Sequence, residues 1–163
     1  MLAAIGNGSV DAALQIEPVM TQGISEGIHV RFGDTTDYAP EAQIAMVLAS
    51  PKFLQDEKDV ALRFMLAYLK GVRDYNDAFI KGTGDKEEII DIMTKHTALK
   101  DPSVWEKVNV TGLNPNGEMF VDDIQNQYEM YKANGAIQGD VNFEDAIDTA
   151  ITEEAVDILG RYE

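Results

Sequence analysis

Three segments of the chain show the apolar patterns of β-strands. Residues 10–17 alternate with a period of two, and residues 28–34 form a second candidate after a helical pattern over 18–26. This order predicts a β-α-β unit, and therefore parallel strands with a right-handed crossover. Residues 43–50, QIAMVLAS, form a nearly continuous apolar run. Such a run is typical of a strand covered on both faces.

Most of the remaining chain has a helical pattern of apolar residues. Ser50-Pro51 and Asp101-Pro102 are typical helix starts, with a capping side chain followed by proline. Residues 108–121 are irregular, with a turn signal at Asn116-Gly117. Helices are expected over 1–5, 18–26, 58–79, 86–96, a short stretch around Trp105, 121–134 and 142–162, the last with a break near Thr149.

The strand predicted over 43–50 has no obvious neighbour. The chain that follows it is mostly helical, and unpaired backbone groups in a core are costly. The strand must therefore pair with the segments before residue 38, with residues 108–121, or with a segment outside this chain. These elements together predict a helix-rich α/β fold with parallel sheet elements.

Composition narrows the classes of function. The 163 residues are 45% apolar, enough for a folded core, and carry a formal net charge of -16. Such an acidic surface repels phosphate backbones and anionic membranes, so nucleic acid is not an expected partner. The absence of Cys removes disulfides, thiolate nucleophiles and zinc-thiolate sites. The first residues lack the pattern of a signal peptide.

Catalytic and metal-binding signatures are sparse. The two histidines, His29 and His96, lie in unrelated segments, and we expect structural roles for both. Residues 140–148, DVNFEDAID, have the spacing of a calcium loop but carry Asp145 where such loops need glycine. We therefore expect no catalytic residues, no metal site and no cofactor.

Polar residues at the predicted strand ends are the best candidates for binding. Gln15 and Glu17 share one face of the first strand, directly before the helix that begins at Pro18. Ligands of parallel sheets meet the carboxyl ends of strands. Glu17 could accept hydrogen bonds from a ligand, or it could simply cap the helix. Tyr38 follows the next strand end and is a third candidate.

The stretch GSVDAALQIEPVMTQGISEG, residues 8–27, resembles a motif of ABC-transporter substrate-binding proteins of the nitrate/sulfonate/taurine type. That family also includes binders of thiamine-pyrimidine precursors. The resemblance continues through the apolar run and long helix of 39–76, and through MTKHTALKDPSVWEKV, NPNGEMFVDDIQNQYEMYKANGAI and VNFEDAIDTAITEEAV. It therefore covers nearly all of the chain in order.

The resemblance implies an incomplete two-lobe periplasmic-binding-protein fold. Residues 1–38 correspond to the end of lobe two, 39–44 to a crossover or hinge, and 45–163 to the C-terminal part of lobe one. The first half of such a protein, with strands of each lobe and an export signal, has no counterpart here, so the sequence is expected to be truncated.

The resemblance also implies a function. The intact parent would be an extracytoplasmic protein, periplasmic or membrane-anchored, that binds a small nitrogen- or sulfur-containing solute between its lobes and delivers it to an ABC permease. Glu17 matches the acidic residue that lines the cleft in relatives. Ile16 stands where relatives often have Trp, which argues against sulfonate and taurine ligands.

The resemblance implies one further class of function, and the sequence leaves another function and one assembly property open. A pyrimidine-precursor synthase is a related enzyme class, but it relies on a Cys-rich loop that is absent here. A free-standing helical interaction domain is the other alternative. Unpaired sheet edges also predict a homo-oligomer, formed through those edges or by exchanged elements.

Overall fold

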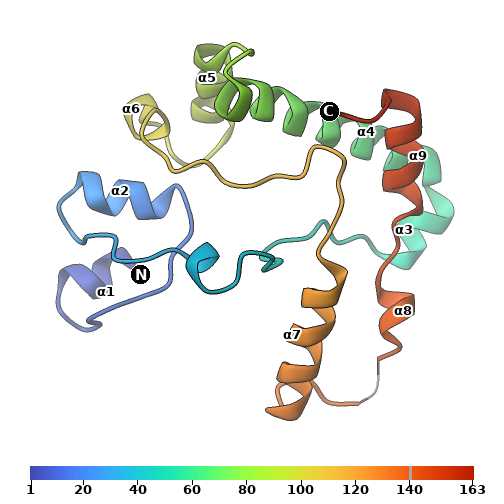
Figure 1. The fold of residues 1–163 in the computed structure, drawn as a ribbon, viewed down its shortest axis with the longest axis horizontal. Coiled ribbons are helices and arrows are strands. Elements are labelled where there is room, and N and C mark those ends of the chain that lie inside the picture. The colour runs from blue at the N-terminus through green and yellow to red at the C-terminus, as the bar shows by residue number, and fades with distance from the viewer. Residues whose placement is uncertain (140) are drawn as a thin grey trace. The chain divides into compact units, whose positions relative to one another are not determined.

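Helices supply all of the regular secondary structure in the described residues, 1–139 and 141–163 (Figure 1). In this computed structural model 53% of the chain is helical. The helices are α1 (Leu2–Gly6), α2 (Val19–Ser25), η1 (Thr35–Asp37), α3 (Pro51–Asp56), α4 (Lys58–Asn76), η2 (Asp77–Lys81), α5 (Lys86–His96), α6 (Pro102–Trp105), α7 (Val121–Ala133), α8 (Phe143–Ala146) and α9 (Ala150–Leu159).

The predicted parallel sheet is wrong, and with it the α/β fold class. None of the segments 10–17, 28–34 and 43–50 forms a strand in the part of the chain that the structure describes. A strand completes its hydrogen bonds only against a neighbouring strand, and none of the three segments lies against another as a ladder. Several of their apolar side chains remain in solvent: Leu14 is 80% exposed and Leu48 is 89% exposed.

The helix predictions are confirmed. A helix pairs its own backbone groups, and some helix starts are also encoded by a local cap. The predicted helix over 58–79 is α4 continued by the π-helical turn η2, and the predicted break near Thr149 separates α8 from α9. Ser50 Oγ accepts a hydrogen bond from Phe53 N at 3.1 Å, as the cap of α3. Asp101 Oδ1 accepts one from Ser103 N at 2.9 Å, as the cap of α6.

The chain forms two compact units, each made of two stretches of sequence. Unit 1 comprises Met1–Gly33 and Asp74–Leu113, and unit 2 comprises Asp34–Arg73 and Asn114–Glu163. Helix α4 belongs to unit 2 up to Arg73. Whether residues 1–38 and 45–163 match two lobes of a larger protein stays a prediction.

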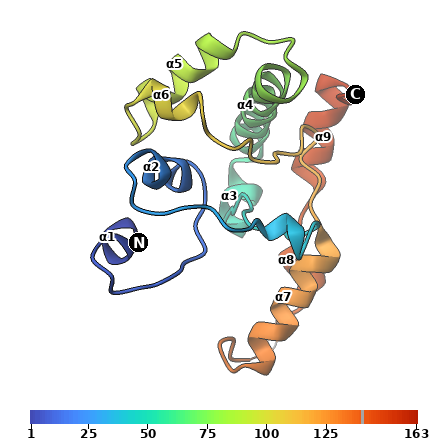
Figure 2. The ribbon, with the colours of Figure 1, turned by 60° about the vertical axis from the view of Figure 1, so that its left-hand side comes forward.

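The core of unit 1 is built around the short helix α6. In both ribbon views α6 lies beside α5, and it also contacts α2 (Figures 1 and 2). Val104 and Trp105 of α6 are buried, as is Ile90 of α5. The Trp105 indole N–H donates to the Leu99 carbonyl at 3.2 Å, so the ring is buried without an unsatisfied donor.

The core of unit 2 is built around Leu69 of α4, which is fully buried. Ala61 and Val72 of the same helix and Ala155 of α9 are also buried. The predicted turn at Asn116-Gly117 packs directly against this core. A Cβ added at Gly117 would lie 2.6 Å from Thr152 Cγ2 and 3.3 Å from Leu69 Cδ2.

We expect Gly117→Ala to destabilise the protein more than Gly135→Ala. Both glycines have left-handed backbones, with φ of +69° and +74°, but only Gly117 has atoms within 4 Å of an added Cβ. The shared backbone cost is about 1–2 kcal/mol, and overpacking adds about 1–3 kcal/mol at Gly117. Urea unfolding of both variants measures the difference, and equal destabilisation would contradict the packing described here.

Candidate functional site

Glu17 is the centre of a polar cluster in unit 1. Its Oε2 atom accepts a hydrogen bond from Thr21 N at 3.0 Å, in the first turn of α2. Its Oε1 atom accepts bonds from Arg31 Nη2 at 3.0 Å and from Asn109 N at 3.3 Å. The carboxylate therefore caps α2 and also joins three separate stretches of the unit.

The Glu17–Arg31 ion pair is partly shielded from water. The Glu17 side chain is 11% exposed and that of Arg31 is 30% exposed. Shielding strengthens their attraction, but it also makes the loss of either partner costly, because the other charge remains in a poorly solvated position. This ion pair connects Arg31, in the loop after α2, to Glu17, which lies before the same helix.

Tyr75 extends the cluster. Its hydroxyl oxygen accepts a hydrogen bond from Thr111 N at 3.1 Å, and its ring stacks on Phe79 with 4.8 Å between ring centroids. Burial raises the pKa of the Tyr75 hydroxyl above its ordinary value, and the Glu17 charge raises it further, while the bonds with Thr111 act in the opposite direction. We define the Glu17 cluster as Glu17, Arg31, Tyr75 and the backbone of residues 109–111.

The other two predicted ligand residues lie outside this cluster. Gln15 Oε1 accepts a hydrogen bond from the amide of the next residue, Ile16, at 2.9 Å. Tyr38 belongs to unit 2 and is 83% exposed. Only Glu17 therefore takes part in a structured polar site, and a ligand contact at any of the three residues stays a prediction.

The sequence does not single out Arg31, Tyr75 or Asn109 as ligand residues. The sequence does mark Arg31 as unusual, because it is the one Lys or Arg in the apolar run IHVRFGD. Tyr75 looked like an ordinary residue of a helix face. Asn109 contributes only its backbone amide, which no residue type encodes.

The histidines lie at separate places in unit 1. The His29 ring packs against Gly23 of α2, since a Cβ added at Gly23 would overlap His29 Nε2. His96 ends α5, as its position in the sequence predicted. It borders a shallow hollow of about 550 Å³ whose other lining residues are Asp85, Glu87, Glu88, Asp91, Ile92 and Lys95.

The described residues hold no cluster of three or more Asp, Glu, His or Cys side chains that could bind a metal ion. The candidate calcium loop over 140–148 begins at Asp140, which lies outside the described residues.

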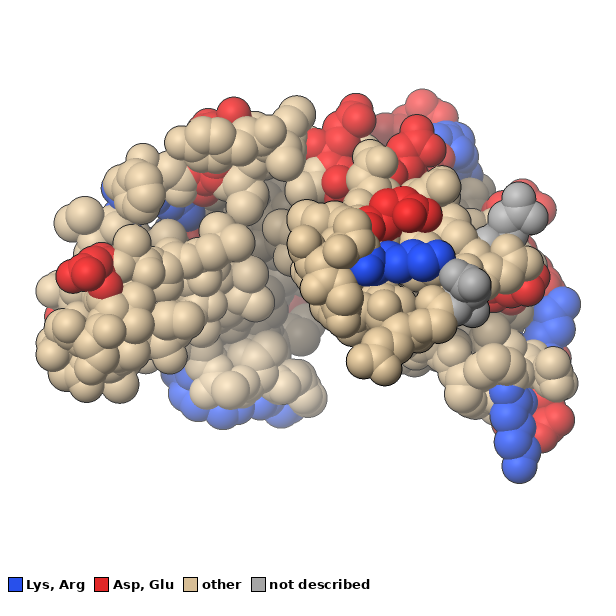
Figure 3. Space-filling view, turned by 90° about the horizontal axis from the view of Figure 1, so that it is seen from below, with Lys and Arg blue, Asp and Glu red and all other residues tan. Residues whose placement is uncertain are grey.

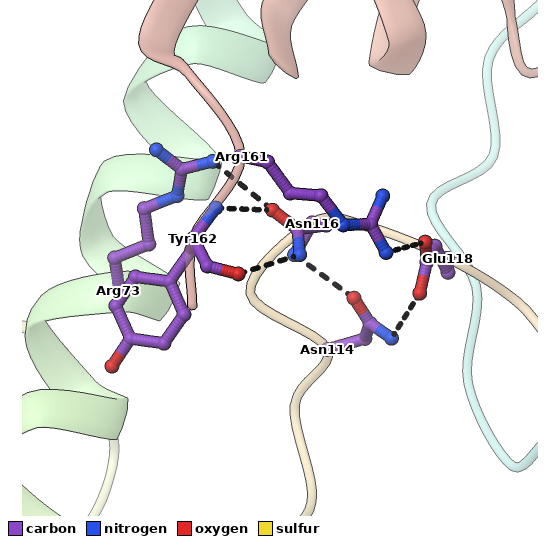
Figure 4. A network of polar contacts seen from close by, with 6 residues as sticks. All are labelled: Arg73, Asn114, Asn116, Glu118, Arg161 and Tyr162. Atoms are coloured by element: carbon purple, nitrogen blue, oxygen red, sulfur yellow. Dashed lines mark hydrogen bonds and ion pairs between the residues drawn. The ribbon is translucent and has the colours of Figure 1, made fainter. Parts of the chain in front are cut away.

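A second polar cluster fastens the C-terminal residues of unit 2 to α4 (Figure 4). Arg73 donates to the Pro115 carbonyl at 3.0 Å and to the Gly160 carbonyl at 2.7 Å. The buried Asn116 side chain accepts from Tyr162 N at 2.9 Å and donates to the Tyr162 carbonyl at 3.1 Å. These bonds satisfy backbone groups in the same way that a strand neighbour would, so this cluster is structural.

Glu118 extends this second cluster toward solvent. Its carboxylate accepts hydrogen bonds from Arg161 Nη2 at 2.6 Å and from Asn114 Nδ2 at 3.2 Å (Figure 4). The bond from Arg161 is the main reason that the pKa of Glu118 lies below its ordinary value, and the bond from Asn114 adds to it. Because the pair is exposed, it contributes little to the free energy of unfolding.

No protein-family model, no curated protein and no solved structure matches the chain. Among the described helices, none combines the length and the apolar character that a membrane crossing requires.

We expect Glu17→Ala to lower the free energy of unfolding by roughly 1–3 kcal/mol, because it removes the cap of α2 and one partner of Arg31. Glu26→Ala is the matched control. Within the described residues the Glu26 carboxylate accepts a hydrogen bond from Gln22 Nε2 one turn earlier and is exposed, so its loss should cost less than about 0.5 kcal/mol. Equal effects of the two substitutions in urea unfolding would contradict a structural role for Glu17.

Tyr75 should make the protein sensitive to alkaline pH. Its pKa is higher in the folded state than the ordinary value of 10.0, so the unfolded chain loses this proton first. The stabilisation is complete below about pH 10 and disappears as the pH rises through the folded pKa. We expect unfolding free energy to fall less steeply above about pH 10 in Tyr75→Phe than in the unchanged protein.

If the unfolding free energy of Tyr75→Phe falls as steeply above about pH 10 as that of the unchanged protein, the Tyr75 hydroxyl does not titrate as described.

Proposed function

We propose that the chain is the solute-binding component of an ABC import system and that it binds a small nitrogen- or sulfur-containing molecule at the Glu17 cluster. In the intact system the loaded protein would act outside the cytoplasm and deliver the solute to the permease. The proposal concerns binding alone and does not include the parallel-sheet architecture, which the fold excludes. It rests on the resemblance of residues 8–27 and on the chemistry of the cluster.

The position of Asn109 is the observation that carries the proposal. Its amide lies 3.3 Å from Glu17 Oε1, which is longer than the bonds from Thr21 and Arg31 and beyond the usual range for an N–H···O bond. This bond is also exposed. An amine or hydroxyl donor of a solute could therefore replace the Asn109 amide at modest cost, while the other two bonds keep the carboxylate in place.

The rest of the cluster suits a solute with both donors and acceptors. Arg31 supplies a guanidinium group for an anionic or carbonyl oxygen, and the Tyr75 hydroxyl can donate to a further acceptor. Glu17 alone would select for a donor group. This combination favours a polar molecule that carries nitrogen over an apolar one.

A thermal-unfolding screen with amines, sulfonates, nitrate and pyrimidines tests the proposal. A solute that binds the folded state adds roughly 2.7 kcal/mol to the free energy of unfolding when its concentration is about 100 times its Kd. We expect at least one class to raise Tm in the unchanged protein and in Glu26→Gln. The rise should be lost in Glu17→Gln, which keeps an acceptor for Thr21 but loses the charge.

Comparing each variant with and without solute separates binding from intrinsic stability. In an amide-resolved NMR titration, the Asn109 signal should move with the same solute. The proposal fails if no class raises Tm, or if the rise persists unchanged in Glu17→Gln.

A helical protein-interaction domain is the second candidate function. It is favoured by the all-helical secondary structure of the described residues. This alternative predicts no response to any small solute. The thermal screen therefore distinguishes it from the solute-binding function.

A further inference from the structure

The chain leaves more surface exposed than its mass requires. The exposed area is 11308 Å² for 18.0 kDa. A compact monomer of this mass exposes about 8,000 Å², and two separate bodies of half the mass expose about 9,700 Å² in total. The exposed area therefore exceeds that of two separate compact bodies by about 1,600 Å². A standard interface buries ~800 Å² on each partner, so the surplus is large enough to supply one.

Part of this surplus lies on residues 43–50 of unit 2, the segment QIAMVLAS. It contains no charged residue, although the chain has a net charge of -16. Broad areas of the face drawn in Figure 3 likewise carry no charged side chain. The large apolar side chains of the segment are all substantially exposed: Ile44 by 66%, Met46 by 44%, Val47 by 44% and Leu48 by 89%.

The two ends of this segment are held in place. At one end, Gln43 N donates to Asp123 Oδ2 at 2.8 Å, and the Gln43 carbonyl accepts from Gln127 Nε2 at 2.9 Å. The Gln43 side chain also accepts from Phe120 N at 3.0 Å, next to α7. At the other end, Ser50 caps α3.

Between these ends the Ala45 carbonyl accepts a hydrogen bond from Gln43 Nε2 at 2.7 Å, but the backbone amides are open. In the described structure, the amides of residues 44–49 donate to no other protein group. A segment that is anchored at both ends, with open amides between them, loses less entropy on docking than a free loop. It has the properties of an edge to which another strand can add.

We propose that residues 43–50 are a self-association surface, on which the same segment of a second copy pairs in antiparallel fashion about a two-fold axis at Met46. Ile44, Met46 and Leu48 lie on one face of an extended chain. The two-fold axis brings Met46 beside Met46 and Ile44 beside Leu48, so on this face large apolar residues meet each other. The contact is isologous and closes at a dimer.

A second copy fits this surface better than a cationic partner does. The acidic side chains of the molecule lie outside residues 43–50, so an oppositely charged partner would find no charge to pair with there. The same net charge makes two copies repel at long range. Raising the salt concentration should therefore strengthen self-association and weaken binding of a cationic protein.

Sedimentation equilibrium of the full chain tests the proposal. Interfaces of standard size have Kd values of micromolar or below, so we expect dimers at roughly 100 μM protein. Association should tighten between about 0.01 and 0.15 M salt, as the Debye length falls from ~30 to ~8 Å. Leu48→Lys should weaken dimerisation by a factor of at least ~10. Leu14→Lys alters a similarly exposed leucine outside the segment and should leave dimerisation unchanged.

Cysteine cross-linking tests the register directly, because the chain contains no Cys. Opposed residues of antiparallel strands have Cα atoms about 4.5–5.5 Å apart, within the range of a disulfide. Under mild oxidation Met46→Cys should form a covalent dimer rapidly, and Leu14→Cys should not.

The proposal is overturned by a monomer at roughly 100 μM and 0.15 M salt. It is also overturned by a dimer that Leu48→Lys leaves intact, by one that salt weakens, or by equal cross-linking of the two cysteine variants. It requires no solute and is independent of the proposed function, so the thermal screen can fail while these results hold.

Discussion

The hydrogen bonding of the backbone determines the organisation of this protein. A helix pairs its own N–H and C=O groups, so α4 and α5 form wherever apolar spacing and caps allow. A strand can pair only with a second strand, which must be supplied from elsewhere. The three apolar segments of 10–17, 28–34 and 43–50 have no such neighbour among the described residues. They therefore remain without regular structure, even though their sequences favour strands.

Hydrogen bonds from side chains pair some of the backbone groups that a sheet would otherwise pair. Arg73 and Asn116 fasten the C-terminal residues of unit 2, and Gln43 is fastened beside α7. Glu17 plays the same part in unit 1, where one carboxylate caps α2 and joins Arg31 and Asn109. The same residue can be structural in the free protein and still offer one replaceable bond to a solute, because its three donors are not equally well placed.

Local features of the sequence predicted the helices well and the sheet poorly. Ser50 and Asp101 encode helix starts through contacts with residues two or three positions away, and these contacts are present. The run QIAMVLAS encodes only a preference for burial and extension, and whether it forms a strand depends on what lies beside it. Glu17 was identifiable from its position before Pro18. Its partners at 31 and 109 were not, since they are brought to it by tertiary structure, and Asn109 contributes only backbone.

In the described structure of the single chain, the amides of residues 44–49 are unpaired, whereas the helices pair their own backbone groups. Hydrogen–deuterium exchange of dilute, monomeric protein measures this difference residue by residue. We expect the amides of 44–49 to exchange at nearly the rate of an unstructured peptide, while those around Leu69 in α4 are strongly protected. Protection of 44–49 comparable to that of α4, at a concentration where the protein is monomeric, would show that these amides are paired in the single chain.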